Sequence, residues 1–200
     1  MEKFSQNDEQ FFILDYLKDK STGKFIDIGA FHYEKFSNTR ALYLNGWKGI
    51  FVEPAPKNFE AIQKHYENDP EITVLNIAIG DTTGEIEFYA CEDAVSTSDF
   101  AHMDKWNKAG VPFEKIKVPQ MSAVQFMNQY CVDVDFLSID TEATNINVFR
   151  NIPDFVWEQI KMLCIEHDGH HHEIEDKLSG FGFTKLYFNA ENILLAKLNL

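Results

Sequence analysis

Apolar and polar residues alternate along the chain with two periods, one typical of strands and one typical of helices. Three apolar runs, at residues 25–28, 49–53 and 72–79, have the length and the β-branched or aromatic content of buried strands. Helices are predicted between them, at residues 37–44 and from Pro54 onward. This order of strands and helices predicts a parallel sheet.

A helix is also predicted before the first strand, at residues 8–19. Its apolar side chains fall on one side, opposite acids and lysines, and are Phe11, Phe12, Leu14 and Leu17.

The pattern changes after residue 80. Residues 81–84 predict a turn, and residues 85–89 alternate polar and apolar side chains as a half-exposed strand does. Residues 91–120 are the least regular part of the chain, with a short helix predicted near residues 103–108. A loop this long in a compact domain is usually functional, so we expect it to form a lid or a wall of the substrate site.

The second half of the chain returns to alternating helices and strands. Strands are predicted at 135–139 and 161–165, helices from Ser122, near 147–151, from Pro153 and at 173–178, and a final antiparallel hairpin at 184–188 and 193–197. The whole pattern predicts an α/β fold, a Rossmann-like, doubly wound, mostly parallel sheet with helices on both faces. We expect one domain over residues 1–200, with an N-terminal helix and lead-in at 1–23 and the core at 24–197.

Composition narrows the classes of partner and the cellular location. The formal net charge of −14 repels phosphate backbones, so we expect no nucleic-acid partner. No apolar run approaches the roughly 20 residues of a membrane span, and residues 1–8 lack the apolar core of a secretory signal. We therefore expect no membrane partner and a cytoplasmic location. Nothing in the sequence fixes an oligomeric state.

The first two predicted strands end in residues suited to a nucleoside. Asp27, Ile28, Gly29 and Ala30 form a small-residue turn after the first strand, and Glu53 ends the second. In a doubly wound sheet such a turn admits a nucleotide-like ligand, and the acid accepts hydrogen bonds from ribose hydroxyls. The further glycines of a dinucleotide fingerprint are missing, which disfavours NAD and FAD and favours a cofactor without phosphates.

Carboxylates end three of the predicted core strands. These are Glu53, then Asp140 with Glu142, and finally Glu166, which precedes His167. Ligands in open α/β sheets bind beyond the carboxyl ends of the strands, so we expect these acids to converge on one cleft. The alternative interpretation is that each acid caps the helix that follows it.

Histidines at 170–172 also suggest a metal site. Adjacent side chains point in different directions, so a solvated loop is the simpler interpretation of this run. We predict no metal ligands, although the strand-end acids are of the kind that a divalent ion takes.

With these residues placed, the chain resembles the FkbM family of S-adenosylmethionine-dependent methyltransferases, within the class I Rossmann-like superfamily. The resemblance runs from about Phe25 to Lys197 and rests on the segments 26–30, 37–39, 46–49, 52–54, 78–81, 135–142 and 165–167. It implies a seven-stranded sheet with an antiparallel final hairpin. It also implies methyl transfer, usually to an oxygen of a sugar or small metabolite, so the expected partner is a small-molecule or carbohydrate acceptor.

The resemblance also implies roles for individual residues. Asp27, Gly29 and Ala30 would hold the amino-acid end of S-adenosylmethionine, Glu53 the ribose, and Ala78 and Ile79 the adenine; Phe31, Ser37, Asn38 and Pro54 complete the expected cofactor site. His167 is the expected base because its intrinsic pKa is near neutral. Asp140, Glu142 and Glu166 are expected to orient the acceptor, assist the base or hold a divalent ion.

Two alternatives stay open, and departures from the family pattern support the first of them. Phe31, His32 and Tyr33 stand where smaller or polar residues are usual, and Ala143 stands where glycine is usual. A chain that binds the cofactor without catalysis is therefore one alternative. A metal-dependent hydrolase built on the acids and histidines is the other, although it leaves Glu53 and the small-residue turn without a purpose.

Overall fold

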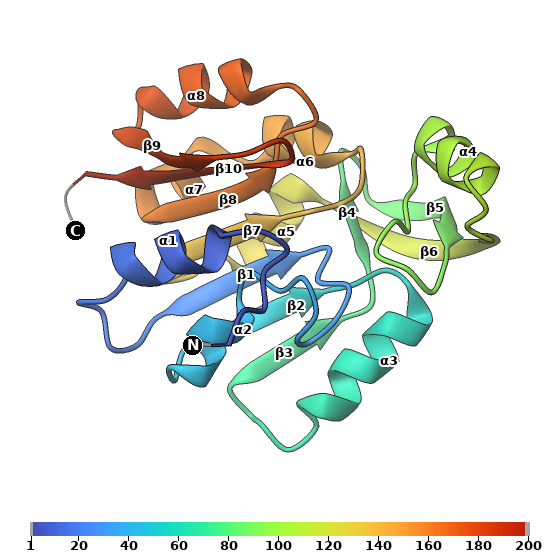
Figure 1. Ribbon diagram of the computed structural model, residues 1–200, viewed down its shortest axis with the longest axis horizontal. Helices are drawn as coiled ribbons and strands as arrows, with labels where there is room; N and C mark the ends of the chain where they lie inside the picture. The colour runs from blue at the N-terminus through green and yellow to red at the C-terminus, as the bar shows by residue number, and fades with distance from the viewer. Residues whose placement is uncertain (1, 199–200) are drawn as a thin grey trace.

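A seven-stranded sheet forms the centre of the computed structural model, which describes residues 2–198. Its strands stand in the order β3-β2-β1-β7-β8-β10-β9 (Figure 1), and β10 runs antiparallel to both of its neighbours. The strands are β1 (Lys24–Ile28), β2 (Lys48–Val52), β3 (Ile72–Leu75), β7 (Phe136–Ile139), β8 (Met162–Glu166), β9 (Phe183–Phe188) and β10 (Asn192–Lys197). The predicted mostly parallel sheet with an antiparallel C-terminal hairpin is confirmed.

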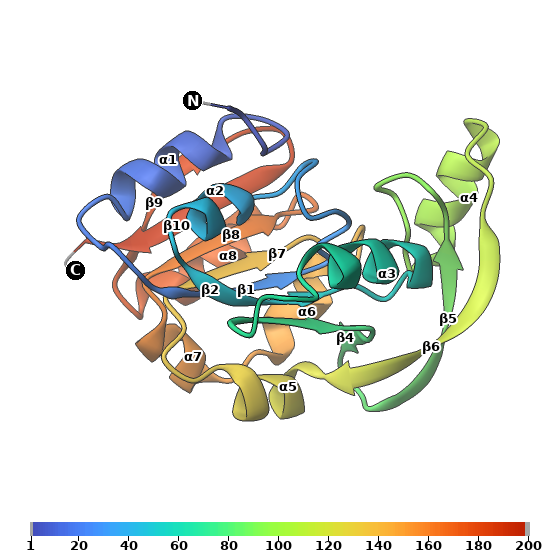
Figure 2. The same ribbon diagram turned by 90° about the horizontal axis from the view of Figure 1, so that it is seen from below.

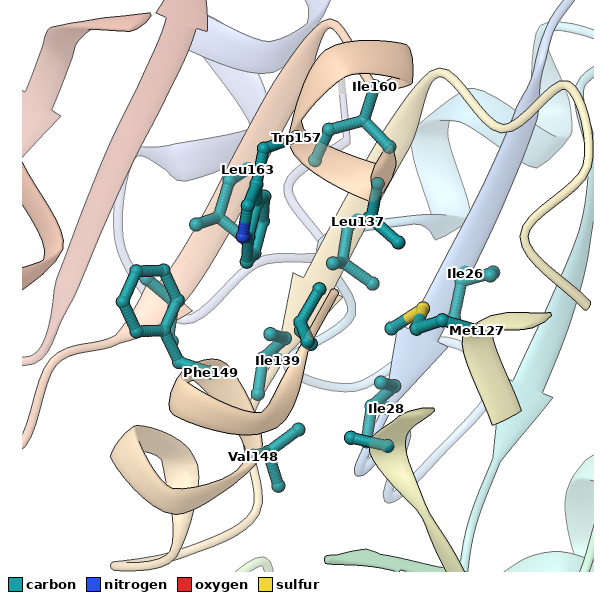
Figure 3. Packing of buried hydrophobic residues seen from close by; sticks show 14 of the residues in the cluster. Ile26, Ile28, Met127, Leu137, Ile139, Val148, Phe149, Trp157, Ile160 and Leu163 are labelled. Atoms are coloured by element: carbon teal, nitrogen blue, oxygen red, sulfur yellow. The ribbon is translucent and has the colours of Figure 1, made fainter. Parts of the chain in front are cut away.

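Helices cover both faces of this sheet (Figure 2). One face carries α1 (Glu9–Tyr16), α2 (Arg40–Leu44) and α3 (Pro56–His65), and the other carries α5 (Ala123–Tyr130), α6 (Asn145–Asn151), α7 (Asp154–Gln159) and α8 (His171–Ser179). Successive strand residues point to opposite faces, so Ile26 and Leu137 pack with Met127 and Trp157 (Figure 3). Phe25 and its neighbours pack against the first three helices instead.

A second, three-stranded sheet stands beside the main one, and α4 (Phe100–Lys108) lies next to it, in the connection between its last two strands along the chain (Figures 1 and 2). Its order is β4-β6-β5, with β4 (Ala78–Gly80), β5 (Gly84–Ala90) and β6 (Glu114–Ser122). Two expectations were wrong here. The apolar run 72–79 is two strands in different sheets, and residues 91–120 contain most of the nine-residue strand β6.

The N-terminal helix buries only part of the side that its apolar residues mark, since Leu17 is buried and Leu14 packs against the core. Phe11 and Phe12 are exposed, whereas Glu9 and Gln10 are buried. Glu9 accepts hydrogen bonds from Asn189 and Asn192 at the C-terminal hairpin, at 2.8 and 3.0 Å. These polar contacts orient α1 in a way that hydrophobic periodicity does not predict. No helix within residues 2–198 is both long and apolar enough to cross a membrane.

Candidate functional site

The turn after β1 brings its backbone against β2 and β7. The amides of Gly29 and Ala30 both donate to the carbonyl of Val52, at 2.9 and 3.1 Å, and the amide of Asp140 donates to the carbonyl of Ile28 at 2.8 Å. Gly29 has φ +81°, and a Cβ at this position would overlap the carbonyl oxygen of Asp140. Glycine is therefore required where the ends of the three strands meet.

Glu53 is buried at the end of β2 and holds the same turn through its side chain. Its Oε2 accepts from the amide of Phe31 and its Oε1 from the amide of Ala55, both at 2.8 Å. Burial raises the pKa of the Glu53 carboxyl to about 7, although the two amides oppose the shift. The side chain of Asn76 fixes the backbone here by donating to the carbonyls of Glu53 and Pro54.

Two adjoining pockets open at this edge of the sheet. The first lies between the ends of β1, β2 and β7, and the second lies on the side of β1 and β7. The residues that line both pockets, and so lie between them, are Gly29, Phe31, Ala94, Asp140 and Glu142. Neither set of lining residues includes a lysine or arginine from the described part of the chain.

Most of the residues expected to bind the cofactor lie at these pockets. Glu53, Pro54, Ala78 and Ile79 line the first pocket, and Asp27, Ala30 and Asn38 line the second. Ser37 lines neither, because its buried hydroxyl accepts from the amide of Arg40 and bonds to Thr39. The first pocket is also lined by residues with no individually predicted role, of which Ala94, Ser96 and Ser98 belong to the expected lid or wall at 91–120; the others are Asn58, Ile77, Phe88, Thr141 and Thr144.

The bulky residues after the turn take different directions. Phe31 has left-handed backbone, with φ +51°, and its side chain lines both pockets. Its ring stacks on that of Phe36 at a centroid distance of 6.2 Å. Tyr33 instead stacks on His65 of α3, with centroids 3.9 Å apart, and His32 accepts from the amides of Glu34 and Lys35. Phe31 is therefore the one member of this group that shapes the pockets.

The strand-end acids converge, as expected, but not all of them line a pocket. Glu53, Asp140 and Glu142 face the first pocket, while Glu166 lies behind Asp140 and lines neither pocket. The side-chain amide of Asn145 donates to the carboxylate of Glu166 at 2.6 Å and to that of Asp168 at 3.0 Å. Burial, together with repulsion among the acids, raises the pKa of Asp140 well above its usual range and that of Glu166 to about 7.

His167 is not brought to the pockets. Its Nδ1 accepts from the amide of Gly169 at 3.0 Å, and its Nε2 lies 3.2 Å from the carbonyl of Asn189. The ring also stacks on Phe188. Both ring nitrogens are therefore occupied by backbone groups.

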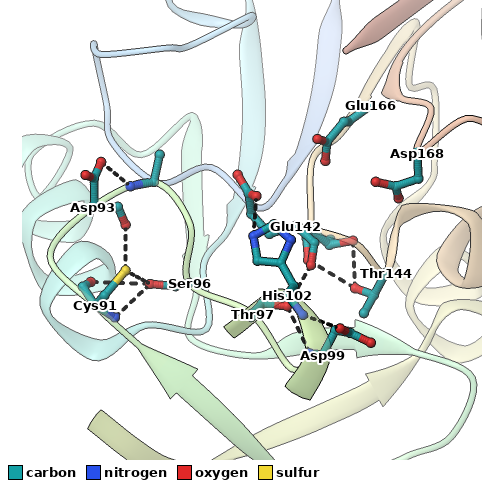
Figure 4. A network of polar contacts seen from close by, with 12 residues as sticks. Cys91, Asp93, Ser96, Thr97, Asp99, His102, Glu142, Thr144, Glu166 and Asp168 are labelled. Carbon is teal, nitrogen blue, oxygen red and sulfur yellow. Dashed lines mark hydrogen bonds and ion pairs between the residues drawn. The ribbon is translucent and has the colours of Figure 1, made fainter. Parts of the chain in front are cut away.

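A different histidine reaches the acids, from α4. His102 Nε2 lies 3.1 Å from Glu142 Oε2, at ion-pair distance although not in hydrogen-bond alignment (Figure 4). No signal in the sequence pairs these two residues, because α4 lies within the irregular segment and reaches Glu142 only through tertiary packing.

The pockets fit a cationic, ribose-bearing cofactor. Glu53 offers a carboxylate at the end of β2, and the buried Oδ1 of Asp140 has no hydrogen-bond partner within residues 2–198. A sulfonium or ammonium group would offset the charge of these acids. No group of three His, Cys, Asp or Glu side chains within residues 2–198 is arranged to hold a metal ion.

The Ala143→Gly substitution is expected to stabilise the protein by about 1 kcal/mol. Glu142 and Ala143 both adopt left-handed backbone, with φ +52° and +70°, which glycine accepts without a Cβ penalty. Chemical denaturation measures the change. Ala109→Gly is the control, because Ala109 has φ −81° and glycine brings no relief there. A loss of stability in Ala143→Gly would contradict the expectation.

Thermal stability is expected to fall as the pH rises from about 5 to about 8. Glu53 has an ordinary pKa of 4.5 and a folded pKa of about 7, so between these values the folded protein keeps a proton that the unfolded chain has lost. The free energy of unfolding therefore decreases through this window, by at most about 3.5 kcal/mol for Glu53 at about 1.4 kcal/mol per pKa unit.

Scanning calorimetry across this pH range tests that expectation. Glu53→Gln should show a shallower fall than the unsubstituted protein, whereas Glu60→Gln, at an exposed position on α3, should leave the slope unchanged. Equal slopes in all three proteins would show that Glu53 ionises in the folded state as it does in the unfolded chain.

Known proteins match the chain both in sequence family and in fold. The sequence model of the methyltransferase FkbM domain matches residues 27–185. The fold is similar to that of methyltransferase FkbM from Methylobacillus flagellatus KT, with a TM-score of 0.55 and 12% identity over 88% of this chain and 44% of that chain. The chain thus spans less than half the length of that relative.

A second solved structure matches over almost the whole of both chains. It is an rRNA methylase from Streptococcus thermophilus, with a TM-score of 0.53 and 8% identity over 100% of this chain and 99% of that chain. At such identities the likeness shows the fold alone. A comparison with curated proteins finds no match.

Proposed function

The chain belongs to the methyltransferase FkbM domain family, and from that premise we propose that it methylates an oxygen of a sugar or other small hydroxyl-bearing metabolite, using S-adenosylmethionine. One observation carries the proposal. The turn at Gly29 and the buried carboxylate of Glu53 face the same pocket as Asp140 and Glu142, although the four residues come from three strand ends.

The two pockets would hold different parts of S-adenosylmethionine. Glu53 would accept from the ribose hydroxyls with the lone pairs that the amides of Phe31 and Ala55 leave free. Ala78 and Ile79, which line the first pocket beyond Glu53, would flank the adenine. Asp27, Ala30 and Asn38 line the second pocket and would hold the amino-acid end.

Glu142 is our candidate for the base. S-adenosylmethionine supplies a methyl group on a sulfonium, and a hydroxyl acceptor must lose a proton as it receives that methyl. Glu142 lines both pockets, so its carboxylate can reach the junction between cofactor and acceptor. Asp140, which lines both pockets beside it, would shape the same junction. His167 has no part in this proposal, because backbone groups occupy both ring nitrogens.

The charge of the pockets favours an acceptor without phosphate. Asp27, Asp140 and Glu142 line the second pocket, and no cationic side chain from the described residues joins them. A neutral polyol avoids the repulsion that a phosphorylated acceptor or a nucleic acid would meet. The exposed ring of Phe36, stacked on Phe31 at the same pocket, offers an apolar surface to a sugar ring.

The function is tested by product formation on a panel of acceptors. The chain is incubated with S-adenosylmethionine and either neutral glycosides, sugar phosphates or short RNAs, and S-adenosylhomocysteine is quantified. The proposal predicts acceptor-dependent product with neutral glycosides only. Turnover with RNA alone would show that the acceptor is a nucleic acid and not a small hydroxyl-bearing metabolite. Cofactor binding without turnover on any acceptor would favour the non-catalytic alternative.

A further inference from the structure

The segment of residues 91–113, called the lid segment here, connects β5 to β6 and forms one wall of the first pocket. Ala94, Ser96 and Ser98 line that pocket together with strand-end residues such as Gly29 and Glu53. A cofactor in the first pocket would therefore be enclosed between the lid segment and the main sheet. The contacts that hold the lid segment against the main sheet therefore control the opening of the first pocket.

Thr97 joins the lid segment to the turn after β7. Its side chain is fully buried, and its hydroxyl donates to the backbone carbonyl of Glu142 at 2.6 Å. The backbone of Thr97 also exchanges two hydrogen bonds with Tyr89, at 2.8 and 3.0 Å, which ties the lid segment back to β5. The Glu142 turn that receives this contact has left-handed backbone at two successive residues.

His102 makes the second connection, through a side chain. Asp99 caps α4 by accepting from the amide of His102 at 2.7 Å, and the amide of Asp99 donates to the Thr97 hydroxyl at 2.9 Å. This chain of bonds sets the first turn of α4 so that His102 Nε2 lies 3.1 Å from Glu142 Oε2 (Figure 4). Both side chains are mostly buried, with 14% and 18% of their surface exposed.

We propose that His102 and Thr97 latch the lid segment to Glu142, closing it over the cofactor and fixing the direction of the Glu142 carboxylate. His102 is thus a positioning residue that acts through Glu142. The inference rests on the proposed function, because the molecule retained beneath the lid segment is the cofactor or its product. A mostly buried polar contact of this kind, together with the buried Thr97 hydrogen bond, lowers the rate at which the lid segment opens.

Release of S-adenosylhomocysteine tests the latch. His102→Leu keeps the bulk of the side chain and removes its nitrogens, so the dissociation rate constant is expected to rise about tenfold. His102→Gln places an amide nitrogen near the position of Nε2 and is expected to restore most of the slow release. His172→Leu, at an exposed position on α8, is the matched control and should release product like the unsubstituted protein.

A second measurement follows the lid segment without any cofactor. Hydrogen exchange at the amides of Tyr89 and Thr97 is expected to accelerate at least fivefold in His102→Leu and to stay near the unsubstituted rate in His102→Gln.

Three results overturn the proposal in different ways. Equal release rates in His102→Leu and the unsubstituted protein exclude the latch while leaving the cofactor assignment intact. Equal loss in His102→Leu and His102→Gln shows that packing, and not the polar contact, sets the rate. Absence of product binding by the unsubstituted protein contradicts the proposed function, and unchanged hydrogen exchange would then exclude the latch independently.

Discussion

The Gly29→Ala substitution is expected to destabilise the protein by at least about 3 kcal/mol and to abolish cofactor binding. The added Cβ would overlap the carbonyl of Asp140, which is backbone and cannot swing aside as a side chain can. The same residue has φ +81°, so alanine also carries a conformational penalty. Relief requires β1 and β7 to move apart at the edge that holds both pockets.

The Gly46→Ala substitution separates the clash from the conformational penalty. Gly46 has a similar φ of +85°, but nothing lies within 4 Å of the position that its Cβ would take. Its expected cost is only about 1 kcal/mol, from the left-handed backbone. Urea denaturation of both variants gives the comparison. Similar costs in the two would contradict the close approach of β1 and β7.

The Glu53→Ala substitution is expected to weaken the binding of S-adenosylmethionine about 100-fold, which corresponds to about 2.7 kcal/mol. This loss of binding free energy has two sources. One is the loss of the hydrogen bonds from the ribose, and the other is the loss of the hydrogen bonds that the Glu53 carboxylate accepts from the amides of Phe31 and Ala55.

Titration calorimetry measures the affinities, with Glu60→Ala as the control. Glu60 carries the same charge at an exposed position on the adjacent helix α3, so its removal tests the effect of net charge alone. Equal affinity in Glu53→Ala and Glu60→Ala would remove Glu53 from the cofactor site.

The main sheet was predictable because its strands are short apolar runs separated by helices. The strand ends followed from the same pattern, since parallel strands place their carboxyl ends at one edge. Glu53, Asp140 and Glu142 therefore came together as expected. The extent of the single domain over residues 1–200 stays a prediction.

The second sheet was not predictable in the same way. Residues 115–118 alternate lysines with Ile116 and Val118, which is the period of a half-exposed strand, but Pro119 interrupts the run. The split of 72–79 depends on Asn76, whose side chain bonds to the backbone at Glu53 and Pro54 and ends β3. Such a contact between distant segments leaves no periodic signal.

The choice between histidines shows the same limit. His167 follows a strand-end acid, so its position in the sequence suggested a catalytic role, yet its ring is engaged with the backbone of a neighbouring loop. His102 lies 40 positions before Glu142 in an irregular segment, and only the packing of α4 brings it to that carboxylate. Sequence position predicts which residues follow a strand, but not which side chains from an insertion return to it.

The central claim is that the pocket at the ends of β1, β2 and β7 binds S-adenosylmethionine. Calorimetric titration of the unsubstituted protein with S-adenosylmethionine tests it most directly. The expected result is saturable binding of one molecule per chain, displaced competitively by S-adenosylhomocysteine. Absence of binding up to about 1 mM, which corresponds to about −4 kcal/mol, would contradict the claim.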